Sequence, residues 1–236
     1  MRKLWLLIVL LTAPTGASAG PWARAEAESF VALSGERTRD GDGSVNLYAE
    51  YGLSRARTLG FQLGRSKQEL SATVWLQKAF TRGVDHWAVY TGLGAFRREG
   101  HVAPLATLGA SWGRGLGDLP LLRHLPGGGW FTAEAELKFA GQAPQDDLAS
   151  GAGAFAYLTP ETTSKAQLTL GWKVASRIDW INQLRFEDRR DQGRAVNWAS
   201  ALVYDLPGPA KAELGVVLPV SGRGEGAVKL GSWFEF

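Results

Sequence analysis

Apolar and polar residues alternate along most of the chain in segments of about ten residues. In the clearest segment, residues 131–139, apolar side chains occupy the odd positions and polar side chains the even positions. Successive side chains of a strand point to opposite faces of a sheet, so a period of two predicts a strand with one apolar face. Turn-forming residues such as Gly41-Asp42-Gly43 and Pro207-Gly208-Pro209 separate the segments. The pattern therefore predicts an all-β, antiparallel meander.

About twelve strands are expected, which is an even number and suits an up-and-down barrel with both termini at one end. Their expected ranges are 23–34, 43–52, 57–65, 69–80, 86–96, 102–113, 129–140, 162–173, 177–187, 194–205, 210–219 and 225–236.

Aromatic placement favours a transmembrane barrel over a soluble β-sandwich. Aromatic residues from nine predicted strands share the apolar face at one end of the barrel, the end expected in the periplasm. Amphipathic rings prefer the headgroup layer of a membrane, whereas a soluble core would scatter them by depth. The expected periplasmic girdle consists of Tyr51, Phe80, Trp87, Trp112, Phe131, Trp172, Trp180, Tyr204 and Phe234.

The opposite face of the strands carries charges of both signs, which suits a water-filled lumen. A cation on the lipid face would cost roughly 2–4 kcal/mol at the bilayer midplane. The expected lumen-lining residues are Glu50, Glu134, Glu136, Lys138, Lys165, Asp179, Arg185, Lys211, Glu213 and Lys229. Two polar residues, Lys78 and Asn182, fall on the apolar face. A β-bulge at Asn182 would turn its side chain inward.

Residues 1–19 have the features of a cleaved secretory signal, which leaves residues 20–236 as a single barrel domain. Arg2 and Lys3 precede an apolar run, and Ala17-Ser18-Ala19 forms a small-residue cleavage site. Without Arg2 and Lys3 the chain keeps 24 basic and 23 acidic residues. This balance argues against a nucleic-acid partner. The absence of cysteine excludes disulfides and thiolate metal sites.

The last strand ends in Phe236, with apolar residues two, six and eight places before it. This ending resembles the C-terminal signal of Gram-negative outer-membrane barrel proteins. The resemblance implies that Phe234 and Phe236 are read by the barrel-assembly machinery and that outer-membrane lipid surrounds the protein. Ser232 departs from the pattern, which usually has an apolar residue there. Residues 46–60 also resemble a hairpin of uncharacterised proteobacterial barrels, which implies a fold and a location but no activity.

Three features of the sequence are candidates for a catalytic or metal site, and none of them is favoured. Gly109 to Gly113 match the G-x-S-x-G motif of serine hydrolases, but the motif lies inside an alternating strand. Of the three histidines, only His101 falls in an outer loop, as an outer-membrane phospholipase would require, and no Ser and Asn pair accompanies it. Asp146, Asp147 and Glu161 could attract calcium, but a solvated acidic loop is the default. We therefore expect no enzyme, cofactor or metal.

Three functions remain open. The first is a narrow, porin-like passive channel for small polar solutes, in which inward glycines such as Gly60, Gly109 and Gly171 leave space on one side of the lumen. The second is a non-conducting structural or export-accessory barrel that uses the outer loops 35–42 and 141–162. The third, less favoured, is a lipid hydrolase. The apolar connection 118–129 is expected at the inner rim rather than as a plug, and the sequence gives no oligomeric state.

Overall fold

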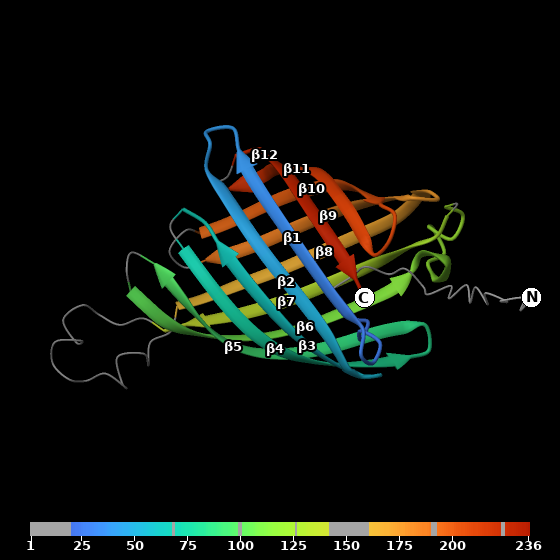
Figure 1. Ribbon diagram of the computed structural model, residues 1–236, viewed down its shortest axis with the longest axis horizontal. Coiled ribbons are helices and arrows are strands. Elements are labelled where there is room, and N and C mark those ends of the chain that lie inside the picture. Colours follow the sequence, from blue (N-terminus) through green and yellow to red (C-terminus); the bar gives the residue numbers. More distant parts are fainter. Residues whose placement is uncertain are drawn as a thin grey trace, which may run out of the picture.

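The computed structural model describes residues 20–67, 69–98, 101–125, 127–141, 161–189, 193–222 and 225–236. The described chain forms a closed antiparallel barrel in which each strand pairs with its neighbours in sequence (Figure 1). The twelve strands are β1 (Ser29–Thr38), β2 (Gly43–Ser54), β3 (Arg57–Arg65), β4 (Glu69–Arg82), β5 (Asp85–Arg98), β6 (His101–Gly115), β7 (Gly129–Ala140), β8 (Glu161–Ala175), β9 (Ile178–Arg189), β10 (Gly193–Asp205), β11 (Ala210–Gly222) and β12 (Ala227–Glu235). The predicted all-β barrel of about twelve strands is confirmed.

The first and last strands close the barrel. β1 pairs with β12 from Phe30 opposite Glu235 to Thr38 opposite Ala227. Beyond this ladder, the backbones of Ser29 and Phe236 donate to each other at 2.9 Å in both directions. We call the end that carries Ser29 and Phe236 the near end and the opposite end the far end. Within the described residues, no helix is long and apolar enough to cross a membrane.

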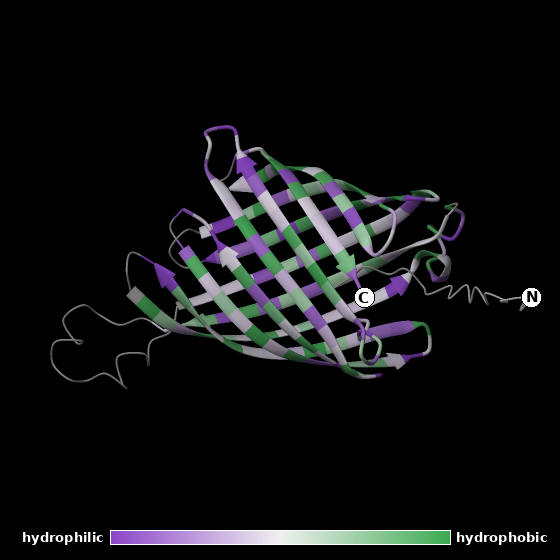
Figure 2. Ribbon diagram, viewed as in Figure 1, coloured by the Kyte–Doolittle hydropathy of each residue, from purple (hydrophilic) through white to green (hydrophobic). Residues whose placement is uncertain are grey.

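The two faces of the barrel differ in polarity, as Figure 2 shows by the alternating colours along each strand. Large apolar side chains are exposed on the outside, including Leu93 at 74% and Leu214 at 59%. Polar side chains such as Thr132 and Gln77 are buried inside. A soluble protein would show the reverse distribution, so the outer surface needs an apolar environment.

The prediction that the first strand begins at residue 23 is wrong. β1 begins at Ser29, and residues 20–28, which we call the N-terminal segment, are not strand. The segment forms other contacts: Ala27 donates its backbone N–H to the Gly52 carbonyl at 2.9 Å, and Gln77 donates to the Gly20 carbonyl at 3.1 Å. The other eleven strands begin and end within three residues of the expected positions.

The β-bulge considered at Asn182 is also wrong. The register of β9 is regular there, with Asn182 opposite Leu170 on one side and Ser200 on the other. Irregularities lie elsewhere, for example between Lys173 and Ala175. Ser200 accepts a hydrogen bond from the Trp180 indole at 2.8 Å, so a small polar patch interrupts the apolar outer face at β9 and β10.

The connection after β6 stays at the near-end rim (Figure 1). It begins with the 3-10 helix Leu116–Asp118 and continues through hydrogen-bonded turns to Leu125. Leu116 is buried, whereas Leu121 is 91% exposed. The barrel end is therefore filled by the N-terminal segment and not by this connection.

Candidate functional site

The barrel interior holds a cavity of about 660 Å³, lined by residues that extend from Gly20 at the near end to Glu36 and Lys138 toward the far end. Of the ten residues expected to line the lumen, seven lie on its wall. These are Glu134, Glu136, Lys138, Lys165, Arg185, Glu213 and Lys229. The other three, Glu50, Asp179 and Lys211, are buried toward the near end.

An arc of aromatic rings covers one side of the cavity. The rings follow one another from β12 through β1 and β2 to β4 and β5, with neighbouring centroids 5.8 to 6.2 Å apart. In order they are Trp233, Phe30, Tyr48, Trp75 and Tyr90. Neighbouring rings are tilted by 35° to 72° to one another, so the arc gives this wall a continuous aromatic surface that is faceted and not flat.

Inward glycines make room for these rings and do not leave space in the lumen, contrary to expectation. A Cβ atom on Gly60 would collide with the Trp75 ring, and one on Gly109 would collide with the Tyr90 ring. Trp130 covers the glycine opposite it, Gly171, in the same way. Each ring lies against the wall because the facing residue of the next strand has no side chain.

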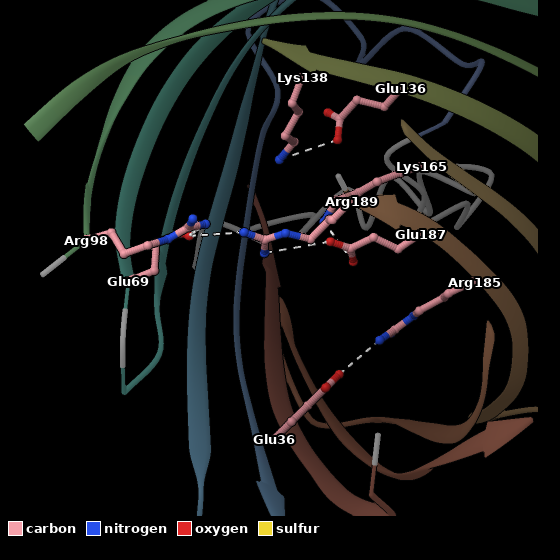
Figure 3. Close-up of polar contacts among 9 residues, drawn as sticks. All are labelled: Glu36, Glu69, Arg98, Glu136, Lys138, Lys165, Arg185, Glu187 and Arg189. Carbon is pink, nitrogen blue, oxygen red and sulfur yellow. Dashed lines mark hydrogen bonds and ion pairs between the residues drawn. The ribbon is translucent and has the colours of Figure 1, made fainter. Parts of the chain in front are cut away.

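Ion pairs cross the barrel near the far end (Figure 3). Glu69 of β4 accepts from Arg98 at 2.8 Å and lies 3.8 Å from Arg189 of β9. Arg189 also approaches Glu187 at 3.9 Å, and Glu187 lies 3.3 Å from Lys165. Because β4 and β9 are not neighbours in the closed sheet, the Glu69–Arg189 contact spans the lumen.

A second crossing pair lies beside the first. Arg185 of β9 donates to Glu36 of β1 at 3.0 Å. Gln183 holds the same guanidinium by accepting from Nη2 at 2.7 Å and from Nε at 3.2 Å. This orientation keeps Arg185 pointing across the lumen. The far end is thus narrowed by charged side chains of both signs.

The N-terminal segment occupies the near end of the interior. Arg24 and Glu50 form an ion pair at 2.8 Å, with side chains only 10% and 4% exposed. Glu50 also accepts from the Tyr48 hydroxyl at 2.7 Å. Gln77 donates to the carbonyls of Gly20 and Trp22 at 3.1 and 3.3 Å. The segment is therefore fixed by buried polar contacts.

Further ion pairs connect β10, β11 and β12 on the inner wall. Lys211 lies 3.5 Å from Asp205 and 3.6 Å from Glu235. Lys229 and Glu213 form a 2.6 Å pair, and the Trp233 indole donates to the same carboxylate at 3.2 Å.

The nine girdle residues lie on outward positions at the near end, and several of their rings touch. Trp112 contacts Trp87 and Phe131, with centroids 6.4 and 6.0 Å apart, and Trp172 contacts Trp180 at 6.2 Å. Asp85 accepts from the Trp112 indole at 2.7 Å. The position of these rings relative to a bilayer stays a prediction. The rings of Phe234 and Phe236 stack 6.4 Å apart, and their role as an assembly signal also stays a prediction.

The weighed chemical sites receive no support from the geometry. Ser111, the serine of the G-x-S-x-G motif, lies within β6, and its buried hydroxyl has no hydrogen-bond partner among the described residues. A serine nucleophile needs a base within hydrogen-bond reach. The described residues contain no group of three His, Cys, Asp or Glu side chains able to hold a metal ion. Asp146, Asp147 and most of the loop 141–162 lie outside the described residues.

The crossing pairs and the path of the N-terminal segment were not predicted from the sequence. Glu36, Arg98 and Arg189 lie beyond the ends of the expected strands, although the same alternation extended by a few residues places all three inward. The N-terminal segment alternates small and charged residues as a strand would.

No protein-family model matches the chain, and comparison with curated proteins finds no match. Solved structures do resemble it. The NanC porin has a TM-score of 0.59 at 11% identity, covering 86% of this chain and 98% of the porin. The KdgM porin in complex with disordered oligogalacturonate has a TM-score of 0.58 at 7% identity, covering 88% and 99%. An outer membrane channel from Pseudomonas putida F1 has a TM-score of 0.59 at 10% identity, covering 93% and 99%. These likenesses establish a shared barrel fold.

Proposed function

We propose that this protein is an integral outer-membrane barrel that forms a narrow, porin-like passive channel for small polar solutes. Residues 1–19 direct export and are removed, and the near end faces the periplasm. The apolar outer face and the aromatic girdle support the membrane location. The porins and the channel that share the fold support the channel function.

The observation that carries the channel function is the polar cavity inside the barrel. Its volume of about 660 Å³ far exceeds the roughly 30 Å³ that one water molecule takes up in the liquid. Carboxylates and cations on its wall can replace part of the hydration shell of a passing ion. Arg185, Lys138, Lys165 and Lys229 would favour anions, whereas Glu134, Glu136 and Glu213 would favour cations.

A second candidate is a non-conducting barrel that anchors or exports a partner. One observation favours it: the described structure is narrowed at both ends, by the N-terminal segment and by the Glu69–Arg189 and Arg185–Glu36 contacts. Passage then requires these contacts to open.

Conductance in planar bilayers separates the two candidates. We expect the purified protein to give small discrete steps and a variant lacking residues 20–28 to give larger ones, because the near end loses its filling. Absence of steps from both proteins, across several salts, would support the non-conducting barrel.

Ion selectivity tests the lumen directly. Arg185→Glu places an acid in the narrow far end and should shift the reversal potential in a salt gradient toward cations. Arg194→Glu is the matched control, because the Arg194 side chain is 88% exposed and pairs with Asp188. Equal selectivity of the two variants would contradict the role of Arg185 in the lumen.

A further inference from the structure

The N-terminal segment crosses the near end of the barrel along a defined path. Arg24 donates its backbone N–H to Thr58 of β3 at 3.0 Å. Gln77 of β4 holds the carbonyls of Gly20 and Trp22, and the Trp22 ring lies 5.3 Å from that of His86 on β5. Pro21 reaches β6, where a Cβ on Gly113 would come within 2.7 Å of the proline Cγ. Gly20 is therefore delivered to the β6 side of the interior.

The register of β6 and β7 shows what Gly20 meets there. Gly113 is opposite Thr132, and the next inward pair toward the cavity is Ser111 opposite Glu134. Gly20, Ser111 and Glu134 line the same cavity. Pro21 covers Gly113, and Gly20 is the residue of the N-terminal segment that lines the cavity, so Gly20 is the one placed to reach the Ser111–Glu134 pair.

This pair has unmet polar groups. Glu136, its neighbour on β7, has Lys138 at 3.4 Å and the Tyr90 hydroxyl at 3.2 Å. No described side chain forms an ion pair or hydrogen bond with Glu134. Ser111 is only 4% exposed, and its hydroxyl also has no hydrogen-bond partner among the described residues. Partly buried carboxylates without a partner are costly, so this geometry suits a ligand that donates several hydrogen bonds and carries positive charge.

We propose that the ligand is the α-ammonium group of Gly20 itself. A signal peptidase hydrolyses the Ala19–Gly20 amide with one water: the hydroxyl joins the Ala19 carbonyl carbon, and the amide nitrogen leaves as an amine that takes up protons. The new ammonium has three N–H donors. It binds the Glu134 carboxylate and the Ser111 hydroxyl, while Gln77 holds the carbonyl of the same residue.

The consequence is a second fixed point for the N-terminal segment. Arg24 pairs with Glu50 on one side of the barrel, and Gly20 pairs with Glu134 on the other. The second contact exists only after cleavage, because an amide nitrogen carries no charge. The inference rests on the proposed removal of residues 1–19, but not on whether the barrel conducts.

The test is acylation of the Gly20 amine by a water-soluble succinimidyl ester, followed by mass spectrometry of the N-terminal peptide. In the folded mature barrel we expect a peptide that begins at Gly20 and reacts at least about tenfold more slowly at neutral pH than in the urea-unfolded chain. The reaction should reach half its maximum at a pH at least about one unit higher than in the unfolded chain, because the carboxylate favours the ammonium form.

Glu134→Gln keeps the shape and removes the charge, so it should return the pH midpoint to the unfolded value even if the amine stays sterically shielded. Glu136→Gln is the matched control and should lower the midpoint less than Glu134→Gln does, because the Glu136 carboxylate has its own partners in Lys138 and Tyr90. An N-terminus other than Gly20, an ordinary midpoint in the unsubstituted barrel, or equal midpoints in the unsubstituted and Glu134→Gln proteins would each overturn the proposal. The measurement on the unsubstituted barrel decides the matter if a variant fails to fold.

Discussion

At the scale of single residues, the interior wall is shaped by pairs of a large ring and a facing glycine. Trp75 is 8% exposed because Gly60 leaves the space in which its ring lies. The ring covers backbone that would otherwise be open, so one aromatic residue serves two strands. The width of the lumen therefore depends on residues that have no side chain.

Gly60→Ala should destabilise the barrel by about 1–3 kcal/mol, because the new methyl group forces the Trp75 ring out of its position. Urea unfolding in detergent micelles, followed by tryptophan fluorescence, measures the change. Gly35→Ala is the control, because its nearest contact would be an ordinary 3.5 Å to the Ser44 carbonyl. Equal unfolding midpoints for the two variants would contradict the role given to Gly60.

A second residue-scale prediction concerns the girdle. Trp180 is 37% exposed on the outer face, whereas Trp75 lies inside. In vesicles whose lipids carry bromine near the headgroup, Trp180→Phe should reduce the quenchable fluorescence and Trp75→Phe should not. Loss of quenching in both variants, or in neither, would argue against a girdle at that depth.

At the scale of elements, the N-terminal segment and β12 each depend on a few contacts. Arg24→Ala leaves the Glu50 carboxylate buried without its cation. Breaking a buried pair in this way costs up to roughly 3–5 kcal/mol unless the segment withdraws. We expect a lower urea midpoint and faster proteolysis within residues 20–28. The double variant Arg24→Met with Glu50→Gln should recover most of the midpoint, and a double variant less stable than Arg24→Ala would refute this account.

The last strand gives a prediction about assembly. Phe236 is 68% exposed on the outer face and contacts the Phe234 ring. In the proposed membrane location Phe236→Ala should therefore lower the stability of the refolded barrel by up to about 3 kcal/mol, the value of moving one large apolar side chain out of water. If the barrel-assembly machinery reads this residue, the same variant should assemble several-fold more slowly into vesicles that contain the machinery. Gel mobility before and after boiling follows assembly. Leu214→Ala on β11 serves as the control, because Leu214 is 59% exposed on the same outer face and lies outside the C-terminal pattern. If Phe236→Ala and the unsubstituted protein assembled at equal rates in vesicles that contain the machinery, Phe236 would have no role as a signal.

At the scale of the whole molecule, the alternation of apolar and polar residues made the fold predictable from the sequence. Most contacts inside the barrel were not predictable, because they form only when the sheet closes. The sequence of each strand indicates by itself which side chains face outward, as residues 131–139 show. Contacts across the lumen depend on the register of all strands together, so no local pattern indicated that Arg189 meets Glu69. The path of the N-terminal segment could not be predicted for a different reason. Its alternation fits a strand pattern, and its path depends on buried polar partners on β2 and β4.

The mutual hydrogen bonds of Ser29 and Phe236 also constrain biogenesis. In a sheet that lacks the pairing of β1 with β12, the outer edges of both strands present backbone amides and carbonyls without hydrogen-bond partners. Within hydrocarbon each such group costs several kcal/mol. In the proposed membrane location the sheet is therefore stable only once β12 has paired with β1, which makes closure and insertion parts of the same step.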